Sequence, residues 1–401
     1  MKKVIRTPSY DLKKRPFMVI WEVTQACDLA CKHCRAEAVP THAPDALTFE
    51  EGKKLLRDVK AFGDPRPILV FTGGDPFKRP DLFDLLSYGK ELGLAMAVSP
   101  SGTPLLSQEN LRRVKESGVK AMSLSIDGPT EEIHDEFRGV PGSFALTERG
   151  WKAANALGLK VQINTTITKH NLHLLPELFT LIARRKVMTW SVFFLVSVGR
   201  GKQLLDITPQ EYEAVMHFLY DCSKYLSIKT TEGHQFKRIV TERSIFERHE
   251  DGSYINEIPE PYSIFREELK RIVKRESLVA RQNIRRLPLH INAGKGFVFI
   301  SHLGEVQPSG FLPLTAGNVK DSSLNKLYQD STLLRSLRDE TNLHGACGCC
   351  EFKRICGGSR SRAYASTGEP LADDSSCVYQ PGSFPYQEEL AQYGPIPNST
   401  A

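Results

Sequence analysis

The stretch that decides the fold of this 401-residue chain reads Thr24-Gln25-Ala26-Cys27-Asp28-Leu29-Ala30-Cys31-Lys32-His33-Cys34. Three thiols fall within eight residues, directly after an apolar, strand-like segment at 17–23. A four-iron cluster held by three cysteines keeps one iron free for a fourth ligand from a substrate or cofactor. Zinc sites more often use cysteine pairs in two separate knuckles, so the spacing favours the cluster. A zinc site completed by a distant residue and a metal-free cysteine cluster are the alternatives.

Short strand-like segments alternate with longer amphipathic segments through the first half of the chain. The expected strands lie at residues 17–23, 68–71, 95–98, 121–126, 161–167 and 191–196. Between them, 49–62 and 172–184 carry apolar residues at helical spacing. Parallel strands joined by right-handed crossovers close into a barrel whose site lies at the carboxyl ends of the strands. We therefore predict an α/β fold built on a partial (β/α)6 TIM-like barrel, with the cysteine loop at its active end.

The pattern changes after the sixth expected strand. From residue 200 to about 290, helix-like patterns at 210–225 and 262–275 surround a polar stretch, and there is no clear strand. Period-two alternation around a turn at 302–304 predicts a β-hairpin over 297–308. We therefore expect three parts: a barrel at 1–199, a helical bridging region at 200–295, and a small cysteine-rich α+β domain at 296–401.

Composition and charge exclude several classes of protein. The chain is 40% hydrophobic, which is ample for a core, yet has no apolar run of the roughly 20 residues that cross a bilayer. The amino terminus lacks an apolar signal core, so we expect a cytoplasmic protein without a membrane partner. A net charge of +6 from mixed charges predicts no nucleic-acid partner. Eight of the nine cysteines lie in two tight clusters, as metal ligands do, and only Cys222 stands apart.

The spacing C-x3-C-x2-C, with His33 at an aromatic-type position, resembles the cluster loop of the radical S-adenosylmethionine (SAM) superfamily. The resemblance implies that Cys27, Cys31 and Cys34 hold a [4Fe–4S] cluster whose free iron is chelated by SAM. One electron from a reductant such as ferredoxin or flavodoxin then cleaves the sulfonium, and a 5′-deoxyadenosyl radical abstracts hydrogen from the substrate. Such chemistry belongs to the cofactor, and the protein supplies binding and orientation.

Two later segments resemble SAM contacts of that family. The segment Gly73-Gly74-Asp75-Pro76 is similar to a Gly-Gly-Glu-Pro loop whose backbone binds the SAM amino group, with Asp75 in place of glutamate. A plain turn is the alternative. Arg138, in a run similar to His-Asp-x-x-Arg-Gly, resembles a guanidinium that clamps the SAM carboxylate. A helix-capping aspartate and a surface arginine are the alternative there.

Polar side chains also gather where the third, fourth and fifth expected strands end. Small hydroxyl and carboxylate groups at these ends suit ribose hydroxyls and an amino-acid moiety. In the fifth strand, alternate residues put polar side chains on one face, where an empty barrel interior would be apolar. We therefore expect cofactor contacts from His33, Ser99, Ser101, Ser125, Asp127, Gln162 and Asn164.

The second cysteine cluster resembles the distal half of a SPASM domain, the auxiliary-cluster module of peptide and sulfatase maturases. The expected ligands of a second [4Fe–4S] cluster are Cys347, Cys350, Cys356 and Cys377. A full SPASM domain holds two auxiliary clusters, but Ser309 and Arg360 stand where further cysteines are expected, so we predict one. Tetrahedral zinc is the alternative. Neither reading needs Cys349.

The run at 356–374 resembles radical SAM enzymes of alternative haem and haem d1 synthesis, which remove or shorten propionate side chains of iron porphyrins. This resemblance implies decarboxylation or side-chain removal on a carboxylate-bearing tetrapyrrole. Arg360, Arg362 and the region 281–286 are candidates to meet the propionates. Lone histidines are usually structural, but candidate iron ligands are His234, His290 and His302.

Other functions stay open at this point. The same radical chemistry serves maturases that modify a peptide or protein. The molybdopterin precursor cyclase also pairs such a loop with a C-terminal cluster, although its cysteine pattern differs. A non-catalytic iron–sulfur protein for electron transfer or sensing is a further alternative. The polar strand ends and the Gly73-Gly74-Asp75 loop speak against that last alternative.

Overall fold

The computed structural model describes residues 5–6, 8–280 and 288–392 of the chain. Its first strands alternate with helices, as the sequence predicts. These strands are β1 (Met18–Glu22), β2 (Ile68–Thr72), β3 (Ala95–Val98), β4 (Ala121–Ser125), β5 (Lys160–Ile167) and β6 (Thr189–Phe194). They pair in parallel in chain order, with Trp21 beside Phe71 and Ser125 beside Asn164. The α/β class and the partial barrel are confirmed.

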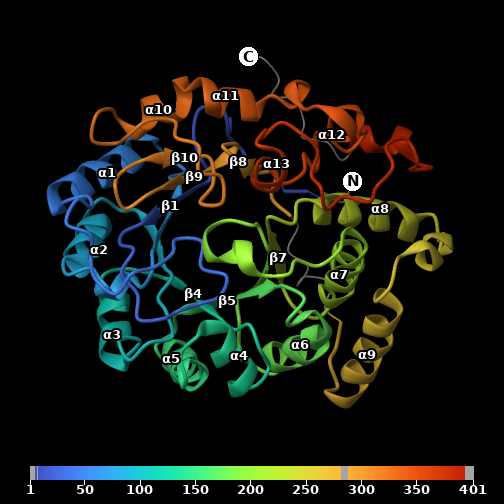
Figure 1. Cartoon of the computed structure of the whole chain (residues 1–401), viewed down its shortest axis with the longest axis horizontal. Helices are drawn as coiled ribbons and strands as arrows, with labels where there is room; N and C mark the ends of the chain where they lie inside the picture. Colours follow the sequence, from blue (N-terminus) through green and yellow to red (C-terminus); the bar gives the residue numbers. More distant parts are fainter. Residues whose placement is uncertain (1–4, 7, 281–287, 393–401) are drawn as a thin grey trace.

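Helices ring the strands on the outside (Figure 1). Those of the first half are α1 (Phe49–Ala61), η1 (Pro76–Lys78), α2 (Leu82–Glu91), α3 (Gln108–Glu116), α4 (Glu131–Arg138), α5 (Ser143–Ala156), η2 (Leu172–Leu174) and α6 (Leu175–Ala183). Helix α1 shows how the sequence specifies this layer, because Thr48 and Glu51 form a capping box at its start. Its apolar stripe, including Leu55 and Val59, is fully buried. The core therefore lies between the sheet and this ring.

The second half of the chain extends the same sheet and adds helices around it. Its elements are η3 (Gly199–Gln203), α7 (Pro209–Cys222), β7 (Ile228–Thr231), α8 (Gln235–Arg248), η4 (Ser253–Glu257), α9 (Tyr262–Arg275), β8 (Asn292–Ala293), β9 (Gly296–Ile300), β10 (Val306–Gln307), α10 (Leu324–Asp330), α11 (Thr332–Arg338), η5 (Glu340–Asn342), α12 (Gly345–Cys349), α13 (Arg360–Thr367) and η6 (Gln387–Gln392). The described strands follow the order β10-β9-β1-β2-β3-β4-β5-β6-β7, with β8 beside β9. Within these described ranges, no helix is long and apolar enough to cross a membrane.

Strand β7 corrects the expectation that residues 200 to about 290 contain no clear strand. It pairs in parallel with β6, where Ile228 lies beside Trp190. Its four residues, Ile-Lys-Thr-Thr, are too short and too polar to show the alternation from which a strand is predicted. Its place is set by the free edge of β6, which is a long-range feature.

The predicted hairpin over 297–308 is confirmed, because β9 and β10 pair antiparallel with Val306 opposite Ile300. Strand β9 also pairs in parallel with β1, where Phe297 lies beside Met18. The sheet therefore runs across both expected boundaries, at 199/200 and at 295/296. The division into three folding units stays a prediction.

Candidate active site

The cysteine loop follows β1 at the carboxyl end of the parallel strands. Cys27 and Cys31 are buried, and Cys34 is half-buried. Backbone amides point at two of the sulfurs, since Leu29 N lies 3.4 Å from Cys27 Sγ and Ala38 N lies 3.5 Å from Cys34 Sγ. Such donors stabilise thiolates and tune a bound cluster. The loop thus presents its thiols in a setting suited to cluster binding.

The glycine pair after β2 docks directly onto the cysteine loop. Gly74 N donates to Thr24 O at 2.9 Å, and Asp75 N donates to Ala26 O at 2.7 Å. A Cβ at Gly73 would overlap Thr24 O, and one at Gly74 would overlap Ala26 O. Only glycine permits this backbone approach. The segment is therefore more than a plain turn, because its backbone packs against the cysteine loop.

Asp75 ties the loops after β2 and β3 together. Its buried carboxylate accepts hydrogen bonds from Thr103 Oγ1 at 2.7 Å and from Phe77 N at 3.2 Å. Burial raises the pKa of this carboxyl, although these hydrogen bonds oppose the shift. Ser101 completes the link, because its hydroxyl donates to Gly74 O at 2.8 Å and lies 3.5 Å from Cys27 Sγ. The shorter Asp75 therefore has a positioning role, and its contact with SAM stays a prediction.

Arg138 packs against the cysteine loop with 12% of its side chain exposed, so it is not a surface arginine. Its guanidinium forms an ion pair with the buried Asp127, and its Nη1 lies 3.6 Å from Cys31 Sγ. Burial favours the neutral form of Asp127, but Arg138 and then the neighbouring histidines and the Thr166 N–H together outweigh it and hold the pKa of that carboxyl below its usual value. The surface-arginine alternative is wrong. The predicted SAM contacts of both residues stay predictions.

His33 lies in a stack of rings beside this ion pair. Its ring faces Phe137 at 4.6 Å between centroids, and Phe137 faces His170 at 5.7 Å. Burial and then the nearby Arg138 lower the pKa of His33 to about 3, so the ring is neutral at neutral pH. Two buried nitrogens here, His33 Nδ1 and Arg138 Nε, find no hydrogen-bond partner among the described residues. Their setting fits a polar cofactor that supplies those partners.

The polar strand ends form two rows on one face of the sheet. The register places Ser123 beside Gln162 and Ser125 beside Asn164. Ser123 also hydrogen bonds with Ser99, and Gln162 Nε2 donates to Asn164 Oδ1 at 2.8 Å. All of these side chains are half-buried. The structure brings the expected residues together, and their contact with cofactor stays a prediction.

Arg200 was not expected from the sequence. It lies in η3, after β6, and its N donates to Cys34 O while its Nε donates to Cys31 O, both at 3.0 Å. Gly199 has φ = 53°, and a Cβ there would overlap Arg35 O. The run Gly-Arg-Gly at 199–201, after the end of an expected strand, is the sequence pattern from which a close backbone contact here could have been predicted.

A second unexpected group lies beneath the cysteine loop. The buried Glu22 ion-pairs with Arg35 and hydrogen bonds with His302 Nδ1 at 2.8 Å. Arg35 also stacks on Phe299, with 4.5 Å between guanidinium and ring centroid. His302, a candidate iron ligand, is thus engaged in a link between β1 and the turn after β9. Of the other two candidate iron ligands, His290 hydrogen bonds through Nε2 with Arg354 O at 2.6 Å, and His234 is the N-cap residue of α8.

The second cysteine set lies between α12 and the segment after α13. Gly358 N lies 3.4 Å from Cys356 Sγ, and Arg360 Nη2 lies 3.7 Å from Cys347 Sγ. Burial raises the pKa of Cys350 and of Cys356 to about 12, so without metal these thiols stay protonated. Binding to iron would deprotonate them, because the metal stabilises the thiolate. Cys349 differs from these, since it is exposed and its thiol donates to Ala346 O.

No three His, Cys, Asp or Glu side chains of the described part of the chain converge on one point where a single metal ion would sit. A four-iron cluster does not require such convergence, because each thiolate binds a different corner of a cube. The thiols and the amide donors around them therefore fit iron–sulfur clusters at both cysteine sets, while their assignment as ligands stays a prediction.

The two positions where further cysteines were expected hold other chemistry. Buried Ser309 donates to Glu232 Oε1 at 3.0 Å, and Glu232 also accepts from Ser359 and Ser361. Buried Arg360 donates to the carbonyls of residues 370 and 372 at 3.0 and 2.8 Å. These positions are filled by hydrogen-bonded side chains, which agrees with one auxiliary cluster.

The arginines named as propionate partners are also accounted for. Arg362 is buried, pairs with Asp374 at 3.3 Å and donates to Leu195 O at 3.1 Å. Because the guanidinium groups of Arg360 and Arg362 form these bonds inside the protein, the structure does not support them as propionate partners. The region 281–286 lies outside the described residues.

A model of the radical SAM superfamily matches residues 21–182, which hold the cysteine loop and the ion pair beside it. An AdoMet-dependent heme synthase of Oleidesulfovibrio alaskensis is 38% identical over 372 residues, 92% of this chain and 88% of that protein. This chain belongs to the radical SAM superfamily.

Further relatives extend the comparison of this radical SAM protein. An AdoMet-dependent heme synthase of Methanosarcina barkeri is 34% identical over 369 residues, 92% of this chain and 97% of that protein. The crystal structure of Streptococcus suis SuiB bound to precursor peptide SuiA superposes with a TM-score of 0.65, covering 91% of this chain and 76% of that one. At 18% identity, SuiB shares the fold.

As a radical SAM enzyme, the protein uses SAM and iron–sulfur chemistry. A cluster with SAM bound would supply the radical that starts hydrogen abstraction, and Cys27, Cys31 and Cys34 would hold that cluster. The chain's own residues hold the cysteine loop from three sides. Gly73-Gly74 pairs with its start, α4 and Arg138 lie against its middle, and Arg200 binds its end. A loop fixed in this way orients whatever its thiolates bind.

Proposed function

We propose that this enzyme makes haem by oxidative decarboxylation of propionate side chains on an iron tetrapyrrole. The observation that carries the proposal is the likeness to AdoMet-dependent heme synthases, which extends along nearly the whole chain. It therefore includes the second cysteine set as well as the barrel. Within this proposal, Cys27, Cys31 and Cys34 hold the SAM-binding cluster. The ligands of one auxiliary [4Fe–4S] cluster are Cys347, Cys350, Cys356 and Cys377.

The reaction balances as a loss of hydrogen, carbon dioxide and one electron from each propionate. The hydrogen atom leaves the carbon next to the macrocycle and forms 5′-deoxyadenosine. The bond to the carboxylate then breaks, carbon dioxide departs, and a vinyl group forms as one electron passes to an acceptor. We assign the acceptor role to the auxiliary cluster, since iron–sulfur clusters transfer single electrons. A separate electron, from a donor such as ferredoxin or flavodoxin, starts each turnover.

Aromatic side chains near the polar strand ends support a flat substrate. Phe193 of β6 lies beside Thr166 of β5, so it shares the face of the polar rows. Phe311, which follows β10, reaches it with 6.5 Å between ring centroids. The pair joins opposite ends of the sheet, and both rings are half-buried. A macrocycle packs on such rings, while hydroxyl and amide groups meet its polar edge.

The decisive experiment uses the anaerobic, reconstituted and reduced enzyme with SAM and iron coproporphyrin. Mass spectrometry should show porphyrin products that have lost carbon dioxide, together with 5′-deoxyadenosine. The variant that lacks Cys27, Cys31 and Cys34 is the control and should form neither product. Formation of 5′-deoxyadenosine without porphyrin binding or change of mass would replace this proposal by the peptide-maturase alternative. No cleavage of SAM would favour the electron-transfer alternative.

The place of action follows from the same chemistry. A donor such as ferredoxin or flavodoxin would supply its electron in the cytoplasm, so we propose that the enzyme acts in that compartment. Fractionation of cells that express the tagged full chain checks this assignment.

A further inference from the structure

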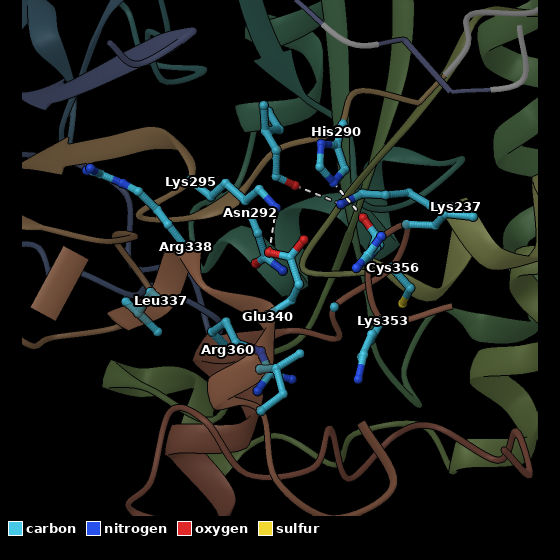
Figure 2. Close-up of a pocket in the computed structure, with 15 residues that line it drawn as sticks. Lys237, His290, Asn292, Lys295, Leu337, Arg338, Glu340, Lys353, Cys356 and Arg360 are labelled. Atoms are coloured by element: carbon cyan, nitrogen blue, oxygen red, sulfur yellow. Dashed lines mark hydrogen bonds and ion pairs between the residues drawn. The ribbon is translucent and has the colours of Figure 1, made fainter. Parts of the chain in front are cut away.

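A small cationic cavity lies beside the second cysteine set. Its volume is about 30 Å³, and Cys356 is one of its lining residues. Lys237 of α8 enters from one side, and Lys295, which precedes β9, enters from another (Figure 2). Glu340 is the one acidic side chain among the described residues that line it. The lining therefore carries a strong excess of positive charge.

The cavity is remote from the SAM-binding loop. Lys295 precedes β9, and β9 runs parallel to β1 with Phe297 beside Met18. The cysteine loop follows the other end of β1. The cavity thus belongs to the amino ends of the strands, whereas SAM chemistry belongs to the carboxyl ends. A ligand here is not the substrate of the radical reaction.

Two lysines in this cavity keep donors to spare. The Nζ of the buried Lys237 donates to Ile291 O at 2.7 Å, its one hydrogen bond within the described residues. Lys295 Nζ lies 3.4 Å from Glu340 Oε2. An ammonium group has three N–H donors, so both lysines have unused ones. Lys353 Nζ likewise makes one hydrogen bond, to Gly348 O, but that residue is less buried than Lys237. Arg338, by contrast, is occupied by backbone carbonyls.

Besides Glu340, the acidic groups that act on Lys237 are the Cys356 thiol and Glu232, and neither forms a hydrogen bond with its ammonium group in the described structure. His290 projects between the two lysines, and burial together with these lysines lowers its pKa to about 3. Its ring is therefore neutral. Two ammonium groups that share one cavity and one carboxylate repel each other. An anion between them would remove the repulsion and accept the unused hydrogen bonds.

We propose that this cavity binds a small carboxylate, or an oxyanion of similar size, between Lys237 and Lys295. About 30 Å³ holds roughly two water-sized groups, which suits the two oxygens of a carboxylate better than a bulkier phosphate ester or a porphyrin. Because Cys356 lines the same cavity, the bound charge disfavours the reduced, more negative form of a cluster on that cysteine. Anion binding therefore lowers the reduction potential of the auxiliary cluster.

Formate is the probe for this site. Calorimetric titration of the anaerobic holoenzyme, with gluconate keeping the ionic strength constant, should show saturable formate binding. Lys237→Met and Lys295→Met should each weaken it by at least about tenfold, since a hydrogen bond between charged groups contributes more than the 1.4 kcal/mol that equals a factor of ten. Lys326→Met, at an exposed lysine of α10, is the control and should change nothing. If Lys237→Met unfolds, the less buried Lys295 still tests the site.

The outcomes separate cleanly. Absence of formate binding, or equal binding in the control and both cavity variants, overturns the proposal. Redox titration followed by electron paramagnetic resonance then tests the link to the cluster, since formate should lower the auxiliary potential in the unaltered protein and not in Lys295→Met. Formate binding with no change of potential would overturn that link. Calorimetry needs no turnover, so its result does not depend on the proposed haem-forming reaction.

Discussion

Arg138 and Asp127 form a buried ion pair whose guanidinium reaches Cys31, with 3.6 Å between Nη1 and Sγ. The other oxygen of Asp127 accepts a hydrogen bond from Thr166 N at 2.7 Å. The pair therefore connects α4, the end of β4 and β5 to the cysteine loop. Any contact that Arg138 makes with SAM comes in addition to this positioning role.

Removing one partner of this ion pair should destabilise the protein more than removing both. Arg138→Met and Asp127→Asn each leave a buried charge without its partner, which costs roughly 3–5 kcal/mol. The double variant should therefore cost less than either single variant. Denaturant unfolding of the four proteins measures the difference. Arg112→Met, in an exposed ion pair with Glu109, is the control and should not change stability measurably.

The same variants separate the two roles of Arg138. Weaker SAM binding at unchanged iron content would support the carboxylate clamp. Loss of iron before loss of SAM affinity would instead show that Arg138 acts through Cys31. Unchanged SAM affinity with full iron content contradicts the clamp.

Gly74→Ala should disturb the cysteine loop, because the new Cβ overlaps the carbonyl oxygens of Gln25 and Ala26. Forcing these backbones apart costs about 1–3 kcal/mol, as overpacking does in a core. We expect lower iron retention and weaker SAM binding, measured by metal analysis and equilibrium dialysis. Gly252→Ala is the matched control, since nothing lies within 4 Å of its Cβ. Equal behaviour of the two variants would contradict the close packing of these loops.

A reconstituted chain should contain about eight iron atoms, and each of the two cysteine sets should hold half of them. Replacing Cys27, Cys31 and Cys34 by alanine should remove half of the iron and all cleavage of SAM. Replacing Cys350 should deplete the other half. Cys349→Ala should leave the iron content unchanged, because the proposed ligands Cys347, Cys350, Cys356 and Cys377 already supply the four thiolates that a [4Fe–4S] cluster needs. Metal analysis and absorbance bleached by dithionite give the answer. One zinc with about four iron would show that zinc occupies the second set.

Two carboxylates that share Arg238 should respond to pH in opposite directions. Glu213 and Glu242 lie 2.5 and 2.7 Å from its guanidinium. Despite burial, Arg238 holds the pKa of Glu213 at about 2, whereas burial raises the pKa of Glu242 to about 7. Since an unfolded glutamate titrates near 4.5, Glu242 lowers stability as pH rises from 4.5 to 7. Glu213 adds stability that is lost as pH falls from 4.5 to 2.

Substitution by glutamine tests this assignment. Glu242→Gln should raise stability at pH 8, where the cost of ionising the buried carboxyl is complete. Glu213→Gln should lower stability at the same pH by roughly 3 kcal/mol, because Arg238 loses its ionised partner. Urea unfolding at pH 5 and pH 8 measures both effects. Loss of stability in Glu242→Gln at pH 8 would reverse the assignment of the two groups.

Local patterns in the sequence determined most of the barrel and both cysteine sets. Apolar segments such as β1 and β5 are read from neighbouring residues, and the spacing of Cys27, Cys31 and Cys34 is itself the ligand pattern. The glycine pair at 73–74 was also readable, since close backbone approach is what glycine in a loop signals. Secondary-structure periodicity and ligand spacing both act over a few residues, which is why one sequence suffices for them.

Only the tertiary structure decided what surrounds these motifs. Glu22 and His302 are 280 residues apart in the chain, and no local pattern announces their hydrogen bond. Strand β7 owes its place to the edge of β6, and most of the Arg138 side chain is covered because α4 folds back on the cysteine loop. The cavity between Lys237 and Lys295 likewise arises where separate elements meet. Burial and long-range pairing depend on how the whole chain packs, and the free energy of that packing is shared among residues far apart in sequence.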